Sequence, residues 1–373
     1  AIEIDFTNSE IIYISGNGGI YKSINSGSSW NIIGDAAFTS MSHSVKDIKL
    51  DPAINLELFV ASDEGLFKSI DGGNNFTQIM NGNFLEIEFH PNNPNTMYFV
   101  KQAGDSTLFY RSDDGGNTLT NFTNGWPNPN SVGGEQKRTE IAVSPASPDK
   151  IVALATGSAN GGSGLYGIYI SDDKGENWTF QCCGPQPAGV PSATNINMMG
   201  WQPDGSDDGG QYYYDLGLAV NPTNADIIHV GGVQHWISFD NGVSFTCPAK
   251  WSEPHKKGYV HADIHDINYF GNDLWFACDG GVFYSDNAGD SIYKKQYGIA
   301  GADFWGFGAG FKDGEVMLGG TYHNGTMLKD GNTYINDWLC TDGGDGIRGF
   351  VNFGNPRVAY SDYGGKVLSG DRT

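Results

Sequence analysis

The segment His261-Ala-Asp263-Ile-His265-Asp266 carries the side chains best suited to metal or acid–base chemistry. Alternate residues of a strand lie on one face, so we expect His261, Asp263 and His265 to lie together. Imidazole and carboxylate groups bind Zn²⁺, and such a trio could hold this ion. The alternative, which we favour, is that the three side chains line a sheet edge and bond to one another or to neighbouring backbone.

Residues 182–215 combine aromatic rings with carboxylates. The aromatic residues are Trp201, Tyr212, Tyr213 and Tyr214, and the acids are Asp204, Asp207, Asp208 and Asp215. Aromatic rings beside carboxylates suit stacking on sugars or capture of a peptide. The run "DGSDDGG" also offers oxygen ligands for Ca²⁺, although it lacks the spacing of an EF-hand. The alternative is a solvated loop packed over its own sheet.

Two carboxylates that face one cleft could hydrolyse a glycosidic bond. Asp215 and Asp263 are the pair that we would assign as acid and base, with Asp266 as the substitute for Asp263. The five arginines of the chain are scattered, so the sequence predicts no arginine cluster for a substrate carboxylate. It contains neither a phosphate-binding loop nor a nucleophile elbow.

A repeated phrase in the sequence indicates which strands and turns must position these residues. The phrase Ser-x-Asp/Asn-x-Gly-x-x-apolar occurs six times, beginning at Ser23, Ser69, Ser112, Ser171, Ser238 and Ser285. Successive copies are 46, 43, 59, 67 and 47 residues apart, a spacing that indicates a propeller or another array rather than separate domains. Alternating apolar and polar residues precede each phrase, so one repeat is expected to hold four antiparallel strands.

The third position of the phrase is occupied by Asn25, Asp71, Asp114, Asp173, Asp240 or Asn287. We expect this side chain to accept hydrogen bonds from backbone N–H groups of its own turn, a structural role. Asparagine keeps the acceptor and lacks the charge, which argues against catalysis or metal binding at these positions. The glycine two residues later supplies a positive φ, and the apolar residue at the end of the phrase is expected to pack into the sheet.

The sequence therefore predicts an all-β fold: a β-propeller of four-stranded antiparallel blades, with seven or eight blades in view. The expected blades are residues 1–35, 45–82, 84–123, 138–182, 212–248, 262–296 and 304–338, with a partial blade at 347–373, all in one propeller domain spanning 1–373. The chain starts inside a strand and its eighth unit stops before the last strand. Either the ring closes by borrowing a strand or the polypeptide continues past Thr373, and we expect the second, with the chain as part of a larger protein.

Composition narrows the choice of partners. With 21 Lys and Arg against 43 Asp and Glu, the formal charge is −22, which repels nucleic acid and anionic lipid. The sequence shows neither an apolar run of about 18 residues nor a signal peptide. The five cysteines lack metal-site spacing, and a disulfide between Cys182 or Cys183 and Cys247 is one candidate pairing.

The six phrases resemble Asp-box (BNR) repeats, known from sialidases, Vps10/sortilin-type receptors and xyloglucanase-type propellers. More narrowly, "VHADIHDINYFGNDLWFACDGGVFYSD", "GGTYHNGT" and neighbouring segments resemble secreted Asp-box propeller proteins of Bacteroidota, often exported by the type IX system. In those proteins the seventh-blade turn usually reads Gln-Asp-Asn-Gly-Thr, whereas this chain has Tyr322-His323-Asn324-Gly325-Thr326. The resemblance implies a secreted propeller and says little about activity.

We predict a binding or adhesion module at the cell surface, within a larger exported protein, for a glycan or protein ligand. The expected contact residues are Trp201, Tyr212, Tyr213, Tyr214, His261, His265, His323 and Asn324. No cofactor is expected, and the expected partners exclude nucleic acid and membrane insertion but include other domains of the same polypeptide. The alternatives are a glycan-active hydrolase of the xyloglucanase-like class, using Asp215, Asp263 and Asp266, and a structural spacer propeller of a surface filament.

Overall fold

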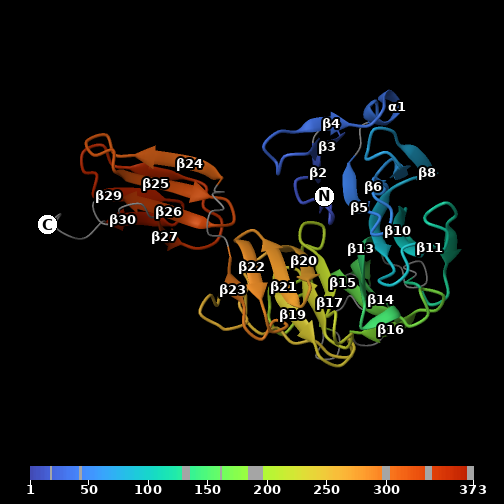
Figure 1. Ribbon diagram of the computed structural model, residues 1–373. Coiled ribbons are helices and arrows are strands. Elements are labelled where there is room, and N and C mark those ends of the chain that lie inside the picture. The colour runs from blue at the N-terminus through green and yellow to red at the C-terminus, as the bar shows by residue number, and fades with distance from the viewer. Residues whose placement is uncertain are drawn as a thin grey trace. The chain divides into compact units, whose positions relative to one another are not determined.

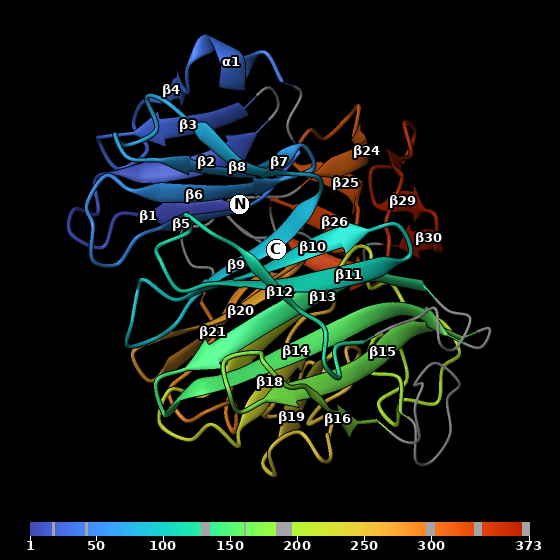
Figure 2. The same ribbon diagram turned by 90° about the vertical axis from the view of Figure 1, so that its right-hand side faces the viewer.

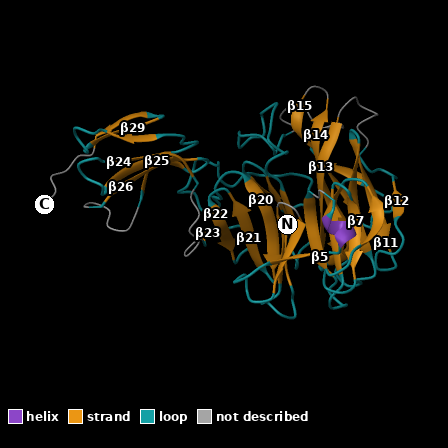
Figure 3. Ribbon diagram, turned by 90° about the horizontal axis from the view of Figure 1, so that it is seen from above, coloured by secondary structure: helices purple, strands orange, loops and turns teal. Residues whose placement is uncertain are grey.

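A computed structural model describes residues 1–16, 19–41, 44–127, 135–159, 162–183, 196–295, 303–331 and 338–367 (Figure 1). The described part of the chain is almost entirely β-strand and turn, with one short helix, α1 (Ala36–Thr39) (Figure 3). It forms two compact units. Unit 1 comprises Ala1–Cys278 and Phe283–Tyr293, and unit 2 comprises Asp279–Val282 and Lys294–Thr373. No helix of the described residues has the length and apolar character needed to cross a membrane.

Six antiparallel sheets follow one another along residues 1–294. They are β1 (Ile2–Ile4), β2 (Ile12–Gly16), β3 (Gly19–Ser23) and β4 (Asn31–Ile33); β5 (Val45–Leu50), β6 (Leu58–Ser62), β7 (Gly65–Ser69) and β8 (Thr77–Asn81); β9 (Phe84–Phe89), β10 (Met97–Ala103), β11 (Ser106–Ser112) and β12 (Thr120–Phe122); β13 (Glu135–Ser144), β14 (Ser147–Ala159), β15 (Gly162–Ser171) and β16 (Thr179–Cys182); β17 (Gly217–Val220), β18 (Ile228–Gly231) and β19 (His235–Ser238); and β20 (Ile264–Phe270), β21 (Asp273–Cys278), β22 (Gly281–Ser285) and β23 (Tyr293–Lys294). In the fifth sheet, the bridge between Ile237 and Thr246 takes the place of a fourth strand.

Unit 2 contains two further antiparallel sheets. The first has four strands, β24 (Phe304–Ala309), β25 (Val316–Thr321), β26 (Gly325–Asp330) and β27 (Leu339–Asp342). The second has three, β28 (Gly349–Val351), β29 (Val358–Ser361) and β30 (Gly364–Val367). The all-β propeller fold of four-stranded antiparallel blades is thus confirmed. The assignment of all blades to one domain stays a prediction.

Within unit 1, the first strands of successive sheets lie side by side, in the order β1, β5, β9, β13, β17, β20. The neighbours β5, β9 and β13 can be followed in Figure 2. The middle strand β6 is covered by sheets on both faces, which is why all five of its residues are buried and the strand does not alternate. The apolar core lies between neighbouring sheets. Phe109 of β11, for example, packs edge-on against Trp178 of the next sheet at a ring-centroid distance of 5.0 Å.

The repeated phrase forms the turn between the third and fourth strands of each sheet in unit 1, and we call it the boxed turn. In the fourth copy, Ser171 Oγ donates to Asp173 Oδ1, the N–H of Gly175 donates to Ser171 Oγ, and the N–H of Asn177 donates to Asp173 Oδ1. The same three bonds, at 2.8–3.0 Å, recur in all six copies. Burial opposes ionisation of Asp173, but the bonds from Asn177 and Ser171 outweigh it and lower the pKa of this carboxyl.

In the third and fourth sheets, the boxed glycine packs closely against the sheet before it. Gly175 has a φ of 84°, and a Cβ built there would lie 2.1 Å from the ring of Phe109 on the preceding sheet. Gly116 stands in the same relation to Phe59, at 2.6 Å. The turn therefore needs glycine both for its backbone conformation and for close packing. The apolar residue that ends the phrase is buried at Trp178 and exposed at Trp30, so the expected packing into the sheet is wrong for the first copy.

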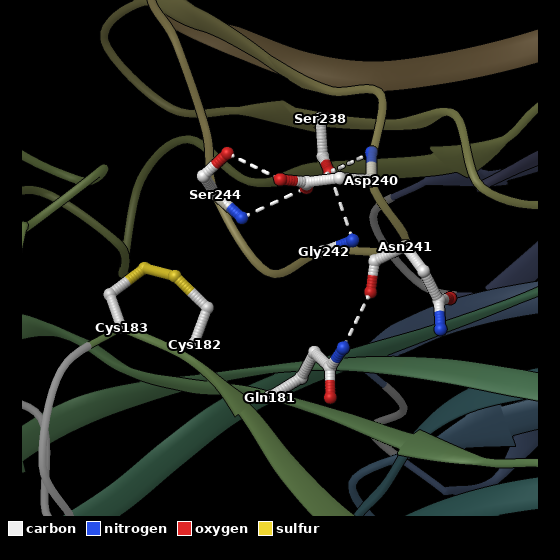
Figure 4. The surroundings of a disulfide bond; sticks show 8 residues. All are labelled: Gln181, Cys182, Cys183, Ser238, Asp240, Asn241, Gly242 and Ser244. Atoms are coloured by element: carbon white, nitrogen blue, oxygen red, sulfur yellow. Dashed lines mark hydrogen bonds between the residues drawn. A yellow bond between two sulfur atoms is a disulfide. The ribbon is translucent and has the colours of Figure 1, made fainter.

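The expected pairing of Cys182 or Cys183 with Cys247 is wrong, because Cys182 and Cys183 are joined to each other (Figure 4). Both are buried at the end of β16 in the core that contains Trp236, and Cys247 has a free thiol. Next to this disulfide, Gln181 Nε2 donates to the carbonyl of Asn241, at 3.0 Å, in the boxed turn of the fifth sheet. The end of β16 is thus tied to the neighbouring sheet by a hydrogen bond rather than by a disulfide.

Replacing Asp173 with alanine removes the acceptor for the turn while leaving Ser171 and Gly175 in place. We expect Asp173→Ala to lower the free energy of unfolding by roughly 1–3 kcal/mol, because backbone N–H groups of the turn lose their partner. The exposed neighbour Asp172 is the matched control, and Asp172→Ala should change it by less than about 0.5 kcal/mol. Urea unfolding followed by tryptophan fluorescence measures both. Equal effects of the two substitutions would contradict the structural role of Asp173.

Thiol counting tests the disulfide. Unfolded and unreduced, the chain should expose three thiols, those of Cys247, Cys278 and Cys340. The substitution Cys247→Ser should leave two. If Cys247 were instead paired with Cys182 or Cys183, the substitution would release a partner, and the count would rise rather than fall.

Candidate functional site

The described part of the insertion, residues 196–215, is a folded segment with exposed aromatic rings. Asn197 anchors it: its Oδ1 accepts from the N–H of Leu165 on β15 at 3.1 Å, and its Nδ2 donates to the carbonyl of Gly209 at 2.8 Å. Met198 and Met199 are fully buried in the core of unit 1. The segment is therefore held on the fourth and fifth sheets and is not a solvated loop. Residues 184–195 of the predicted insertion lie outside the described residues.

The aromatic residues of this segment differ in exposure. Tyr213 is 75% exposed, Trp201 41% and Tyr214 39%. Tyr212 packs against the core and meets the ring of Tyr213 edge-on at 5.9 Å. Because its base is fixed, the segment presents rings to solvent at little entropic cost on binding.

Gln211 brings Asp215 and Asp263 together. Its Nε2 donates to Asp215 Oδ2 at 3.2 Å and to Asp263 Oδ1 at 2.6 Å. Asp215 is completely buried, and its Oδ1 has no hydrogen-bond partner among the residues that the structure describes. Burial raises the pKa of Asp215 to about 7; the bond from Gln211 opposes this rise and the neighbouring Asp263 adds to it. The two carboxylates chosen from sequence are therefore bridged by one side chain.

The geometry expected for His261, Asp263 and His265 is wrong, because the strand begins only at Ile264. Asp263 has a φ of 63°, so side chains do not alternate across this segment. Among the residues that the structure describes, neither His261 nor His265 belongs to a group of three converging metal-ligating side chains. His265 meets the ring of Tyr214 edge-on at 4.9 Å, and His261 Nδ1 lies 3.2 Å from the carbonyl of Ala262. His265 thus packs against Tyr214 of the insertion. Among the described residues it does not form a metal site with His261.

The acids of "DGSDDGG" bond to their own segment. Asp204 Oδ1 accepts from the N–H of Ser206 at 3.1 Å, and Asp207 Oδ2 accepts from the N–H of Gln202 at 2.5 Å. These bonds shape the loop around Gly205. Within the described residues, no convergent set of metal ligands includes these acids.

A second group of acids, which sequence reasoning missed, lies on the first strands of the sheets of unit 1. Its members are Glu3, Asp47, Glu86, Glu88, Glu140 and Asp266, and Lys49 Nζ lies 3.1 Å from Glu88 Oε1 among them. Burial raises the pKa of Glu3 and of Glu140 to about 7. The signal was present in "DIKLDP", "EIEFHP" and "EIAVSP", where polar residues alternate along strands that lie side by side. Asp266 belongs to this group, and the charges that act on it are those of Lys49 and Asp47.

A buried polar chain links the fifth and sixth sheets. His229 Nδ1 lies 2.9 Å from His235 Nε2, and His229 Nε2 lies 2.8 Å from the hydroxyl of Tyr269. Burial lowers the pKa of His235 to about 3 and holds that of His229 well below its usual range. Both rings are therefore neutral packing groups, against which the boxed Gly289 fits.

In unit 2, the predicted contact residues His323 and Asn324 occupy the turn between β25 and β26. Asn324 Nδ2 donates to the carbonyl of Asp279 at 3.0 Å. His323 Nδ1 lies 3.3 Å from carboxylate oxygens of both Asp279 and Asp345. Beside them, the exposed rings of Trp305 and Tyr322 stack at 4.5 Å with an interplanar angle of 12°. The sequence did not single out Trp305, because its partner Tyr322 is 17 positions away.

Comparisons with solved structures agree with the fold. No family model matches the chain, and no curated protein matches it. A GH74 enzyme of Niastella koreensis is 15% identical with a TM-score of 0.54, over 97% of this chain and 62% of that one. An ancestral GH74 enzyme is also 15% identical, with a TM-score of 0.49, over 97% of this chain and 58% of that one. The chain thus spans less than two thirds of the length of either enzyme.

A third similar structure is YCF48 from Cyanidioschyzon merolae. It is 13% identical with a TM-score of 0.42, over 86% of this chain and 92% of that one. At such identities a likeness to solved structures concerns the fold alone and carries no activity or ligand to this chain.

The buried charge of Asp215 predicts a pH dependence of stability. The folded-state pKa of about 7 exceeds the ordinary value, so the protonated form stabilises the fold at low pH and this contribution is lost as the pH rises through 7. Asp215→Asn keeps an oxygen for Gln211 and removes the charge. At pH 8 we expect the free energy of unfolding of the variant to exceed that of the wild type by roughly 1–3 kcal/mol, which raises the urea midpoint. The variant should also lose less stability than the wild type between pH 6 and pH 8.

The exposed Asp208 provides the control, since Asp208→Asn removes a charge from the same segment at a position that is not buried. It should leave the pH dependence of the urea midpoint as in the wild type. An Asp215→Asn variant that is less stable than the wild type at pH 8 would show that the Asp215 carboxylate is ionised and favourably paired in the folded protein.

Proposed function

We propose that the chain is an extracellular glycan-binding propeller, whose contact surface is the segment 196–215 together with His265. The observation that carries this proposal is the set of exposed rings, Tyr213, Tyr214 and Trp201, on a base fixed by Asn197 and the buried methionines. Flat exposed rings stack on the apolar faces of sugars, and nearby carboxylates and carbonyls accept hydrogen bonds from hydroxyl groups. The formal charge of −22 favours a neutral glycan over an anionic one.

The setting of this function is a cell surface. The repeated phrase of this chain resembles Asp-box repeats, and more narrowly those of secreted Bacteroidota proteins exported by the type IX system. In this proposal the propeller is one module of a larger exported polypeptide, and its adhesion or nutrient capture supports that polypeptide's other domains. Neither nucleic acid nor a membrane is its partner.

Binding is favoured over hydrolysis because of the burial of Asp215. A glycosidase needs two carboxylates that both reach the bond to be cleaved, about 5–5.5 Å apart in retaining enzymes. Asp215 and Asp263 share Gln211, and the pKa of about 7 would suit an acid, but a fully buried Asp215 touches no substrate. In our proposal the pair holds Gln211 and so fixes the base of the aromatic segment. Hydrolysis remains the second candidate, with Asp263 and Asp266 as the other acids.

A glycan array and a panel of plant and algal polysaccharides test the proposal on the full chain. We expect binding to a neutral polysaccharide and a roughly tenfold loss of affinity in Tyr213→Ala, because a stacking ring is removed from the surface. Tyr293 is the matched control: it is also exposed, at 53%, and belongs to unit 1 but lies outside the segment. Tyr293→Ala should bind as the wild type does.

Three results would overturn the proposal. A wild-type chain that binds no glycan of the panel would favour the spacer role. Equal binding by the wild type and Tyr213→Ala would place the contact elsewhere. Release of reducing sugar by the wild type, lost in Asp215→Asn, would show a hydrolase.

A further inference from the structure

A β-bulge sets the direction of the Trp305 side chain in unit 2. In the pairing of β24 with β25, Phe304 is opposite Thr321 and Gly306 is opposite Gly320, so Trp305 is the extra residue of the first strand. A bulge takes a side chain out of the alternation of its strand and gives it a new direction. The new direction brings Trp305 onto Tyr322 in the turn between β25 and β26.

The sixth sheet, in unit 1, uses the same position in the same way. The register of β20 against β21 shifts at His265, which is the extra residue there. His265 meets the ring of Tyr214 edge-on at 4.9 Å, and Tyr214 belongs to the aromatic segment of unit 1. In both sheets the bulge in the first strand therefore places a ring against a tyrosine of another segment.

The backbone on either side of the Trp305–Tyr322 ring pair is tightly held. A Cβ built on Gly306 would lie 2.4 Å from the carbonyl oxygen of Ile347, so β24 lies directly against the connection from β27 to β28. The turn after β25 is closed by the bond from Thr321 Oγ1 to the carbonyl of Gly325, at 2.7 Å. Because both backbones are fixed, the ring pair can bind a ligand at little entropic cost.

The ring pair presents an apolar surface to solvent. Trp305 is 57% exposed and Tyr322 is 39% exposed. The two rings stack at 4.5 Å with an interplanar angle of only 12°, so they do not form the angled walls of an aromatic cage for a cation. Flat exposed rings stack on the apolar faces of sugars. The geometry therefore favours a sugar ring over a quaternary ammonium group.

An exposed carboxylate lies next to this ring pair. The N–H of His323, the residue after Tyr322, donates to Asp345 Oδ1 at 3.1 Å. The hydroxyl of Tyr363 donates to the backbone carbonyl of Asp345 at 3.0 Å, which holds the same segment in place. The Asp345 side chain is 54% exposed, so it can accept hydrogen bonds from hydroxyl groups of a ligand and repels an anion. The surroundings thus match a neutral ligand rich in hydroxyl groups.

We propose that Trp305 and Tyr322 form a second glycan-binding site, which lies within unit 2. The ring pair stacks on one sugar ring of a neutral glycan, and Asp345 accepts hydrogen bonds from its hydroxyl groups. All three residues lie outside the segment 196–215, so this site does not depend on the contact surface proposed for unit 1.

Fluorine NMR of the full chain, labelled with fluorotryptophan, tests this site. The resonance of Trp305 is assigned by its absence from Trp305→Phe. Titration with cellohexaose, laminarihexaose or mannohexaose should shift this resonance saturably for at least one of the three neutral sugars. The exposed Trp30 of unit 1 supplies the control, and its resonance should not shift. The resonance of Trp201 reports separately on the segment 196–215.

Tyr322→Ala removes one ring of the pair and keeps the reporter. We expect the dissociation constant measured from the Trp305 resonance to rise roughly tenfold or more in this variant. Tyr360→Ala is the matched control, since Tyr360 is also an exposed tyrosine of unit 2 but its ring meets Phe350. It should leave the dissociation constant unchanged. Circular dichroism of the variants checks that they are folded.

The proposal fails if none of the three neutral sugars shifts the Trp305 resonance, or if folded Tyr322→Ala binds as the wild type does. A shift produced only by tetramethylammonium or by a hexamer of galacturonic acid would assign the ring pair to a charged ligand and also overturn it. A shift of Trp201 without Trp305 would overturn this second site alone and support the surface in unit 1. A shift of Trp305 without Trp201 would support the second site and contradict the surface proposed for unit 1.

Discussion

A single side-chain oxygen organises each boxed turn of unit 1. In each copy, Oδ1 of the boxed Asp or Asn accepts from the serine hydroxyl and from a backbone N–H four residues later. The serine in turn accepts from the boxed glycine, and at Gly116 and Gly175 the missing side chain leaves room for a ring of the preceding sheet. The turn thus satisfies its own polar groups and also couples neighbouring sheets, and the packing of Phe109 against Trp178 depends on it.

This constraint explains why the repeat carries no chemistry of its own. The acceptor oxygen is already engaged in hydrogen bonds within the turn. Asn25 and Asn287 accept the same bonds as the aspartates, because these bonds require an oxygen and not a charge. What differs between repeats is therefore where function is to be sought. The largest difference is the segment after β16, which Asn197 attaches to β15 and which covers the buried Asp215.

The sequence predicted the all-β propeller from a repeated phrase and its spacing, because that phrase combines a local hydrogen-bond network with a glycine that both the turn conformation and close packing require. It also predicted that Asp215 and Asp263 belong together. It failed where the backbone leaves the regular pattern: the positive φ at Asp263 breaks the alternation on which the His261 trio rested.

Contacts between distant segments were also beyond sequence reasoning. The bridge through Gln211, the disulfide within Cys182–Cys183, and the meeting of His323 with Asp279 and Asp345 each depend on tertiary structure. A periodicity argument can place residues on a face, but it cannot bring together turns that are tens of residues apart. The acids on the first strands could have been recognised, because each follows the same alternation on strands that line up side by side.

In our proposal, ligand recognition belongs to the segment 196–215 and not to the repeated turns. Hydrogen–deuterium exchange of the full chain, with and without the tightest-binding glycan of a plant and algal panel, measures this most directly. We predict slowed exchange in peptides covering 196–215 and 259–268, and unchanged exchange in the six boxed turns. Protection confined to other segments of the chain would contradict the account.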